Sequence, residues 1–303
     1  MRRGAARIAS RAGRREPYDA PMTPSTTSTT TAGHGTPLLT RTWPASGAPW
    51  ASVLIVHGIA EHSGRYETVG RQLAGAGIEA HSYDLRGFGA SGGRRAYVDA
   101  WREHHDDLEA RLLAVREASA GRPVALFGHS LGGLLALGYV VADPPRERPD
   151  ALVLSAPALE SNVPGWKRRF VRLLSSTMPR MSLANGFDGG LLSRDPAVGI
   201  AYLADPLNLH RTSTRLGAEA LAEQARVLAA LDRLAVPTLV YHGEGDRLVP
   251  TAASGPLEGR PGVIRRTWPG LRHESHNEPE GPAVIESIIS WLRSTFSAAD
   301  GQG

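Results

Sequence analysis

The stretch VALFGHSLGGLLALGYVV, residues 124–141, decides the fold. It begins with a short apolar run typical of a buried strand, and an apolar, helix-forming run follows after only a few residues. Between the two runs lies Gly-His-Ser-Leu-Gly, residues 128–132. The glycines either allow a tight turn and nothing more, or they permit a strained backbone in which the hydroxyl of Ser130 is exposed as a nucleophile. The strand before the serine and the helix after it favour the second interpretation.

Short apolar runs and helical patterns alternate on both sides of this stretch. Strands are expected at residues 52–58, 78–84, 124–128, 151–157, 238–246 and 263–270. Helices are expected at residues 65–77, 98–120, 131–142 and about 282–296. Buried strands that alternate with helices pair in parallel, so the pattern predicts an α/β fold with a mostly parallel sheet and helices on both of its faces.

The alternation is interrupted between about residues 158 and 225. This segment holds several prolines and only short helical patches, and it is too long to be a plain loop. We expect an inserted cap over the carboxyl edge of the sheet, where open α/β sheets bind their ligands. The predicted organisation is an α/β domain over residues 36–297 that carries this cap, followed by a C-terminal tail over 298–303.

Residues 1–35 are predicted to be a disordered tail, because a basic segment passes into a Thr-rich one with few large apolar residues. No apolar segment follows the arginines, so a secretory signal is not expected, and we expect Met22 to be the natural start. The formal net charge of +4 lies entirely within residues 1–21, and the remainder has 28 basic and 28 acidic residues. The predicted domain is therefore balanced in charge and offers no basic surface to a nucleic acid.

The chain has no cysteine, which excludes disulfides, thiolate metal sites and a cysteine nucleophile. The lack of cysteine fits a reducing compartment, and we expect a cytoplasmic protein. No apolar run approaches the ~18 residues that a membrane span requires.

A serine nucleophile needs a general base, and the base needs an acid that orients it. Asp246 and His273 each follow a late strand, so both should lie at the same edge of the sheet as the serine. Glu244 is an alternative acid and His276 an alternative base, because spacing alone does not rank them. His242 lies inside a strand pattern and is expected to be packed.

The oxyanion that forms during acyl transfer needs two backbone donors. One should be the N–H of Leu131, directly after the serine. The other should come from the loop after an earlier strand, and Ile59 in the loop over residues 55–66 is the candidate. Without the serine turn, the His-Gly pair before Ile59 would indicate only the end of a strand.

Several stretches resemble the monoacylglycerol lipase family of α/β-hydrolases, in its bacterial form. They are HGIAEHSGRY (57–66), YDLRGFGASGG (83–93), GHSLGG (128–133) and HESHNEPE (273–280), with LLSRDPAVGIAYLADPL (191–207) similar to a stretch of the cap. The resemblance covers about residues 38–295. Its stretches at residues 57–66 and 273–280 are more specific than the serine motif alone.

The resemblance implies an α/β-hydrolase fold and a carboxylic ester hydrolase that needs no metal and no organic cofactor. It implies Asp246 as the acid, His273 as the base and the N–H groups of Ile59 and Leu131 as the oxyanion donors. It also implies that Glu61, His62, Arg65 and Tyr66 brace the oxyanion loop. The expected reaction is hydrolysis of a monoacylglycerol to fatty acid and glycerol through an acyl-enzyme on Ser130.

The cap contains a candidate lipid-binding helix. Trp166, Phe170 and Leu174 recur at four-residue spacing beside a lysine and several arginines. This stripe suits substrate binding, an acyl-chain entrance or peripheral contact with a membrane. The alternative is a cap helix that packs on the domain with a solvated basic flank.

Two other functions remain open at the level of sequence. The same fold and triad would serve a carboxylesterase or a lysophospholipase with a different cap pocket. A weaker alternative is a non-catalytic binding protein of α/β-hydrolase type. The expected partner is a small lipid ester, and the sequence predicts no oligomeric state.

Overall fold

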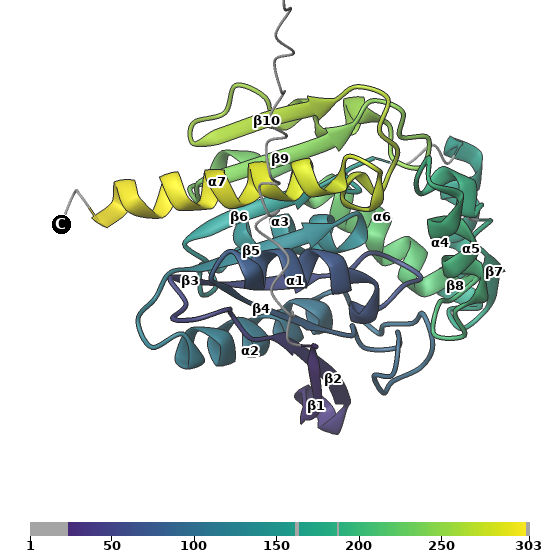
Figure 1. Ribbon diagram of the computed structural model, residues 1–303. Coiled ribbons are helices and arrows are strands. Elements are labelled where there is room, and N and C mark those ends of the chain that lie inside the picture. The colour runs from purple at the N-terminus through teal and green to yellow at the C-terminus, as the bar shows by residue number, and fades with distance from the viewer. Residues whose placement is uncertain (1–23, 161–163, 187, 301–303) are drawn as a thin grey trace, which may run out of the picture.

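The computed structural model describes residues 24–160, 164–186 and 188–300, and its centre is a twisted sheet (Figure 1). The sheet has eight strands in the order β1-β2-β4-β3-β5-β6-β9-β10. Their bounds are β1 Thr26–Thr31, β2 Pro37–Trp43, β3 Ala51–Val56, β4 Ile78–Tyr83, β5 Val124–His129, β6 Ala151–Ser155, β9 Thr238–Gly243 and β10 Val263–Trp268.

Six neighbouring strands pair in parallel, namely β4, β3, β5, β6, β9 and β10. Strand β2 pairs antiparallel with both β1 and β4. The predicted mostly parallel sheet is therefore confirmed. The central strand β3 has β4 on one side and β5 on the other, so the chain connections diverge between β3 and β5. Ligands bind outside the carboxyl ends of strands at such a divergence. The loops after β3 and β5 meet at this position, because Val56 is in register with Gly128.

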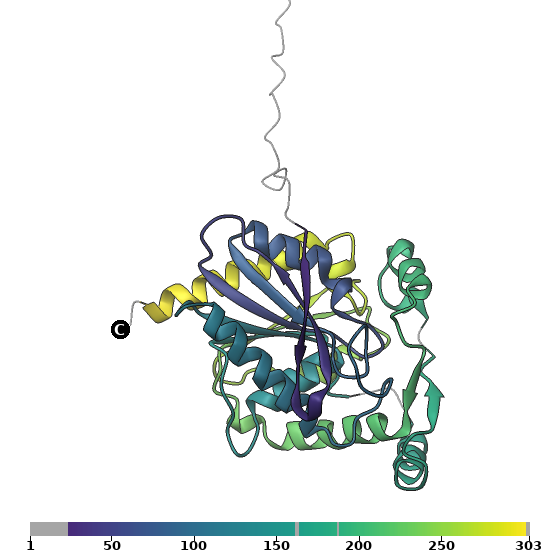
Figure 2. The same cartoon turned by 90° about the horizontal axis from the view of Figure 1, so that it is seen from below.

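Helices cover both faces of the sheet (Figures 1 and 2). Helices α1 (Glu67–Gly75) and α7 (Gly281–Asp300) pack on one face, where the buried cluster includes Phe127, Tyr241 and Ile288. Helices α2 (Arg102–Ala118), α3 (Leu131–Val140) and α6 (Thr214–Ala229) pack on the other. Each strand of a doubly covered sheet is buried on both sides, which is why β3, β5, β6 and β9 read as continuous apolar runs.

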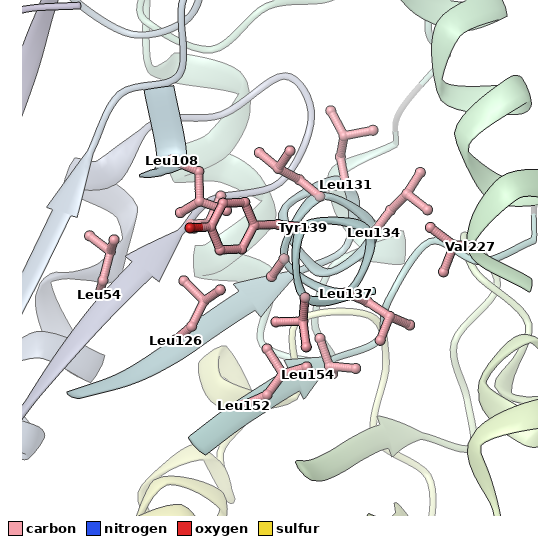
Figure 3. Packing of buried hydrophobic residues seen from close by; sticks show 14 of the residues in the cluster. Leu54, Leu108, Leu126, Leu131, Leu134, Leu137, Tyr139, Leu152, Leu154 and Val227 are labelled. Atoms are coloured by element: carbon pink, nitrogen blue, oxygen red, sulfur yellow. The ribbon is translucent and has the colours of Figure 1, made fainter. Parts of the chain in front are cut away.

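Helix α3 is the most deeply buried helix of the fold, and all ten of its residues are buried. Figure 3 looks along its axis and shows apolar side chains on every side of it. Its neighbours include Leu126 on β5, Leu154 on β6 and Val227 on α6. A helix that is apolar all round must be enclosed by other elements. The enclosure fixes the start of α3, where Ser130 lies, against the sheet.

Between β6 and α6 the chain leaves the sheet, and we call residues 156–213 the insert. It contains α4 (Gly165–Thr177), β7 (Ser182–Ala184), the 3-10 turn η3 (Gly189–Leu191), α5 (Pro196–Ala204) and β8 (Arg211–Ser213). The insert lies to one side of the sheet, at the end away from the C-terminus (Figure 2). Within the described residues, no helix is long and apolar enough to cross a membrane.

The cap was expected to extend to about residue 225, but the structure places most of α6 in the body. Leu216 and Val227 of α6 are fully buried in the same cluster as α3. Helix α6 also packs against α4, so it joins the insert to the core.

The predicted disordered tail differs from the structure between residues 24 and 35. Thr26–Thr31 form the edge strand β1, which pairs with Pro37–Thr42 of β2, and Ser25 donates to Glu67 at 2.9 Å. An edge strand is held by backbone hydrogen bonds and needs few apolar side chains, so its low hydrophobicity was misleading. Residues 1–23, which include the expected start at Met22, lie outside the described part. At the other end α7 continues to Asp300, through the first residues of the predicted C-terminal tail.

Candidate active site

Ser130 lies where β5 ends and α3 begins. Its backbone has φ +52° and ψ −115°, a strained conformation for a residue other than glycine. Three backbone hydrogen bonds hold it there: its N–H donates to Ser155 at 2.9 Å, and its carbonyl accepts from Leu134 and Ala158 at 3.0 Å each. This is the sharp strand-to-helix turn that the sequence predicted, and it directs the hydroxyl toward the carboxyl edge of the sheet.

The glycines around the serine are required by close contacts between backbones. A Cβ on Gly128 would approach the carbonyl oxygen of Gly132 to 2.4 Å. A Cβ on Gly132 would lie 2.2 Å from the carbonyl oxygen of Val56. Since neither backbone atom can yield as a side chain can, both positions need glycine. The glycines therefore let α3 pack directly against the end of β3.

Asp246 and His273 meet at the same edge. His273 Nδ1 lies 2.7 Å from Asp246 Oδ2, and both side chains are buried. The rival residues lie elsewhere: Glu244 accepts from Thr267 on the surface, and His276 stacks on the ring of Tyr66 at 5.4 Å. Of the alternatives left open by the sequence, only Asp246 and His273 form an acid–base pair.

The charges around this pair are set by burial and by each other. Burial alone would raise the pKa of Asp246, but the charge of His273 and several hydrogen bonds hold it well below its usual value. Burial alone would lower the pKa of His273, but the Asp246 carboxylate outweighs it and raises that pKa above its ordinary 6.5. Burial lowers the pKa of His276 to about 4, so this histidine is a weaker base. The structure therefore favours His273 over its rival electrostatically as well as geometrically.

The loop after β3 holds the other predicted donor, Ile59, and a buried carboxylate shapes it. The Gly58 N–H donates to Glu61 Oε1 at 2.5 Å, and the Tyr66 hydroxyl donates to the same oxygen at 2.8 Å. His57 donates to the carbonyl of Gly58 at 2.7 Å. These contacts fix the backbone on either side of Gly58, directly before Ile59.

A buried ion-pair network joins this loop to the loop that carries His273. Arg65 Nη1 lies 2.7 Å from Glu61 and 2.6 Å from Glu274, and its other terminal nitrogen donates to Glu274 at 2.8 Å. Burial opposes ionisation of Glu274, yet the Arg65 guanidinium lowers its pKa to about 2. The sequence did not single out Glu274, because an acid directly after the base has no motif of its own.

The insert contacts the same loop from the other side. Leu209 N–H and the Tyr202 hydroxyl both donate to the carbonyl of Ala60, at 3.1 and 3.2 Å. His62 Nε2 lies 2.8 Å from Asp205 Oδ2 at the end of α5. The braces that the resemblance assigned to residues 61–66 therefore continue into the insert.

A cavity of about 510 Å³ opens over Ser130 and lies between the body and the insert. Ser130, His273, Ile59 and Leu131 all line it. Other lining residues are Glu61, Arg65 and Glu274 from the network, and apolar side chains that include Val171, Leu192, Leu221, Leu248 and Val249. Its volume lies within the range typical of small-molecule sites.

The three residues of α4 predicted to bind substrate do not line this cavity; Lys167 and Val171 do so instead. Trp166 and Phe170 are 67% and 49% exposed, and Leu174 is half-buried. The periodicity identified an amphipathic helix but not which of its sides faces the cavity. Within the described part of the chain, no group of three or more His, Asp or Glu side chains could hold a metal ion.

A mostly parallel sheet that presents a serine at a strand-to-helix turn, with an acid and a histidine on later loops, is the architecture of the α/β-hydrolases. The family model described as "Serine aminopeptidase, S33" matches residues 47–280. A monoacylglycerol lipase of Mycolicibacterium smegmatis is 33% identical over 82% of this chain and 90% of its own length. The human monoglyceride lipase is 32% identical over 86% of this chain and 88% of its own length.

A solved structure gives the same result. The crystal structure of Paleococcus ferrophilus monoacylglycerol lipase matches with a TM-score of 0.77 and 30% identity, covering 85% of this chain and 99% of that one. The chain therefore belongs to the monoacylglycerol lipase family of α/β-hydrolases.

Proposed function

We propose that this protein is a serine hydrolase that cleaves monoacylglycerols to fatty acid and glycerol. The observation that carries the proposal is the placement of Ser130 and His273 in the lining of one cavity, with Asp246 hydrogen-bonded to Nδ1 of the imidazole. A nucleophile, a base and an orienting acid in this arrangement are what acyl transfer through a covalent intermediate requires.

The first half of the reaction forms the acyl-enzyme. His273 donates its Nδ1–H to Asp246, so Nε2 is the basic nitrogen and takes the proton of the Ser130 hydroxyl. The serine oxygen attacks the ester carbonyl, and the N–H groups of Ile59 and Leu131 stabilise the oxyanion. Each such donor contributes about 3–4 kcal/mol to the transition state.

Departure of glycerol completes the first half, and hydrolysis of the acyl-enzyme, the second half, regenerates the serine. The imidazolium of His273 gives its proton to the departing glycerol oxygen, and the acyl group stays on Ser130 as an ester. Water then attacks this ester as His273 removes its proton, His273 returns a proton to the Ser130 oxygen as the ester bond breaks, and the fatty acid leaves. Asp246 stays ionised throughout and stabilises the imidazolium that forms twice, in keeping with its strongly lowered pKa.

The cavity suits a substrate with one apolar chain and a small polar head. Its apolar lining from the insert and from the loop after β9 offers a surface to an acyl chain. The carboxylates of Glu61 and Glu274 are hydrogen-bond acceptors on the same cavity, and glycerol hydroxyls are donors. Relatives that cover most of the chain are named for monoacylglycerols, which supports this substrate class.

The exposed side of α4 supports peripheral contact between a cytoplasmic protein and a membrane surface. Trp166, Phe170 and Leu173 are between 49% and 67% exposed, and four basic residues, Lys167, Arg168, Arg169 and Arg172, lie among them. Apolar side chains edged with cations suit the interface of an anionic bilayer. Ile200 and Leu203 of α5 are further exposed apolar side chains of the insert.

The experiment is a comparison of substrates with wild type and Ser130→Ala. Glycerol release from a long-chain monoacylglycerol should exceed hydrolysis of di- and triacylglycerols, a lysophospholipid and a short ester. The variant should lose both turnover and labelling by a fluorophosphonate probe while its unfolding temperature is unchanged.

The other outcomes separate the alternatives. A preference for the lysophospholipid, or turnover of the short ester alone, would keep Ser130 as the nucleophile and replace the lipase assignment by lysophospholipase or carboxylesterase. A wild-type protein that ignores both the probe and every ester would be a binding protein.

A further inference from the structure

His242, at the end of β9, is a second histidine that contacts the acid of the proposed triad. Its Nε2 lies 3.1 Å from Asp246 Oδ2, the same oxygen that His273 approaches at 2.7 Å. Both His242 and the Asp246 side chain are fully buried. One carboxylate oxygen therefore lies between two imidazole rings.

The hydrogen-bond partners of His242 fix where its proton must be. Nε2 faces two acceptors, Asp246 Oδ2 and the carbonyl of Val249 at 3.0 Å, so this nitrogen carries a hydrogen. Nδ1 lies 3.0 Å from the Ser254 hydroxyl, which can donate or accept. His242 is therefore a donor toward Asp246 and cannot act as an acceptor there.

The other oxygen of Asp246 is held by the backbone. Oδ1 accepts from the N–H groups of Leu248 and Val249 at 2.8 and 3.0 Å. With His242 and His273 on Oδ2, four donors surround the carboxylate. Only the donor from His242 is a side chain that has no part in the proposed proton transfers.

We propose that His242 is a positioning residue for the reaction: its Nε2–H fixes the carboxylate oxygen of Asp246 that orients His273. This inference rests on the proposed function, because Asp246 and His273 must be the acid and base. His242 does not line the cavity, so it acts through Asp246 and not on the substrate. Loss of its hydrogen bond frees Oδ2 to turn away from His273, and small displacements in a triad can cost ~100-fold in rate.

Two amide substitutions distinguish positioning from packing. The amide nitrogen of His242→Gln lies near the place of Nε2 and can donate to Asp246. The amide nitrogen of His242→Asn lies near the place of Nδ1 and reaches Ser254 instead. Both variants replace a buried ring by a smaller polar group, so their stabilities should fall together. A third variant, His104→Leu, changes a buried histidine on α2 that does not line the cavity.

Three readouts are compared at equal folded fraction. His242→Asn should lower kcat by ~100-fold with KM unchanged, and His242→Gln should stay within about tenfold of wild type. The downfield proton resonance of His273 Nδ1–H should weaken or vanish in the Asn variant only. The acidic limb of kcat/KM should move to lower pH in that variant, because Asp246 then raises the pKa of His273 less.

Equal kcat, pH limb and proton resonance in the Gln and Asn variants would overturn the proposal, whatever their stability. So would a pH shift in His104→Leu as large as that in His242→Asn. If His242→Gln fails to fold, a soluble His242→Asn, which lacks the donor to Asp246, still refutes the proposal when it keeps the wild-type resonance. The resonance needs no substrate, so a failure here is distinct from a failure of the lipase assignment, which would show as an inactive wild type.

Discussion

The carboxyl edge of the sheet and the outer side of α4 each show an arrangement that folding disfavours. The edge buries polar groups, and α4 exposes apolar ones. At the sheet edge, Asp246, His273 and Glu274 are charged or polar and nearly fully buried. On α4, Trp166 and Leu173 are large and apolar and more than 60% exposed. Burying polar groups costs free energy unless each is paired, and exposing apolar groups forgoes the gain of burial.

The two regions differ in how these costs are met. At the sheet edge the buried carboxylates are offset locally, because Asp246 accepts four hydrogen bonds and Arg65 lies between Glu61 and Glu274. On α4 no element of the described chain covers the exposed apolar side chains. A buried network of paired charges indicates a preorganised reaction centre. Exposed apolar side chains on one side of a helix indicate a surface that contacts another molecule.

The largest expected effect separates Asp246 from its neighbour Glu244. Asp246→Asn should lower kcat by ~10⁴-fold, because the amide presents the wrong hydrogen-bonding group to His273 Nδ1. Glu244→Gln changes an exposed acid whose carboxylate accepts from the Thr267 hydroxyl, and it should leave kcat unchanged. Steady-state kinetics on a soluble ester measures both. Similar losses in the two variants would show that the acid of the triad is misassigned.

Removal of the arginine from the buried network should have the next largest effect. Arg65→Met leaves Glu61 and Glu274 buried without a counter-charge, and unfolding in urea should show a loss of about 3–5 kcal/mol. The control is Arg260→Met, whose partner Asp232 is 94% exposed, and it should change stability by less than about 1 kcal/mol. If both changes cost the same, the network does not stabilise the site as its burial implies.

How far the sequence predicts each region follows from the same contrast. The positions of Ser130, Asp246 and His273 could be predicted because each follows a strand of the parallel part of the sheet, and parallel strands end at one edge. The pairing of His242 with Asp246 could not, because a histidine inside an apolar run looks like any packed residue. Strand β1 was missed because edge pairing uses the backbone and leaves no apolar pattern. The sequence did not predict which side of α4 lines the cavity, because helical periodicity identifies an apolar side but not the part of the protein that this side faces.

A pair of glycine substitutions tests how tightly each region is packed. Gly132→Ala places a methyl group against the backbone of β3 and should cost ~1–3 kcal/mol or more. Gly165→Ala at the start of α4 meets nothing within 4 Å and should be neutral or slightly stabilising. Thermal unfolding compares the two variants. A tolerated Gly132→Ala would mean that α3 can move away from β3, and the close contact there would not be a constraint.

The pH dependence of the reaction should show the charge of the buried pair. His273 must be neutral to accept the serine proton, so kcat/KM should rise with pH through the pKa of this residue. Burial lowers that pKa, but Asp246 outweighs it, so the midpoint should lie above 6.5. A profile on a soluble ester from pH 5 to 9 locates it. A midpoint below 6.5 would mean that burial dominates over Asp246 at this site.

The smallest effect on stability is expected on α4. The triple variant Trp166→Ser, Phe170→Ser and Leu173→Ser should change the free energy of unfolding by only about 0.5 kcal/mol, because exposed side chains lose little on replacement. Its binding to anionic vesicles should fall about tenfold or more, since burial of one large apolar side chain contributes ~1.5–3 kcal/mol. Co-sedimentation measures binding, and turnover of monoacylglycerol in vesicles should fall with it while hydrolysis of a soluble ester is retained.

The matched control replaces exposed apolar residues outside the insert. Leu113→Ser on α2 and Ile264→Ser on β10 remove side chains that are 48% and 44% exposed, and they should leave vesicle binding unchanged. Equal losses in the control and the triple variant would mean that membrane contact is not confined to α4. A triple variant that loses several kcal/mol of stability would mean that α4 packs against part of this protein, and the contrast with the sheet edge would then be one of degree.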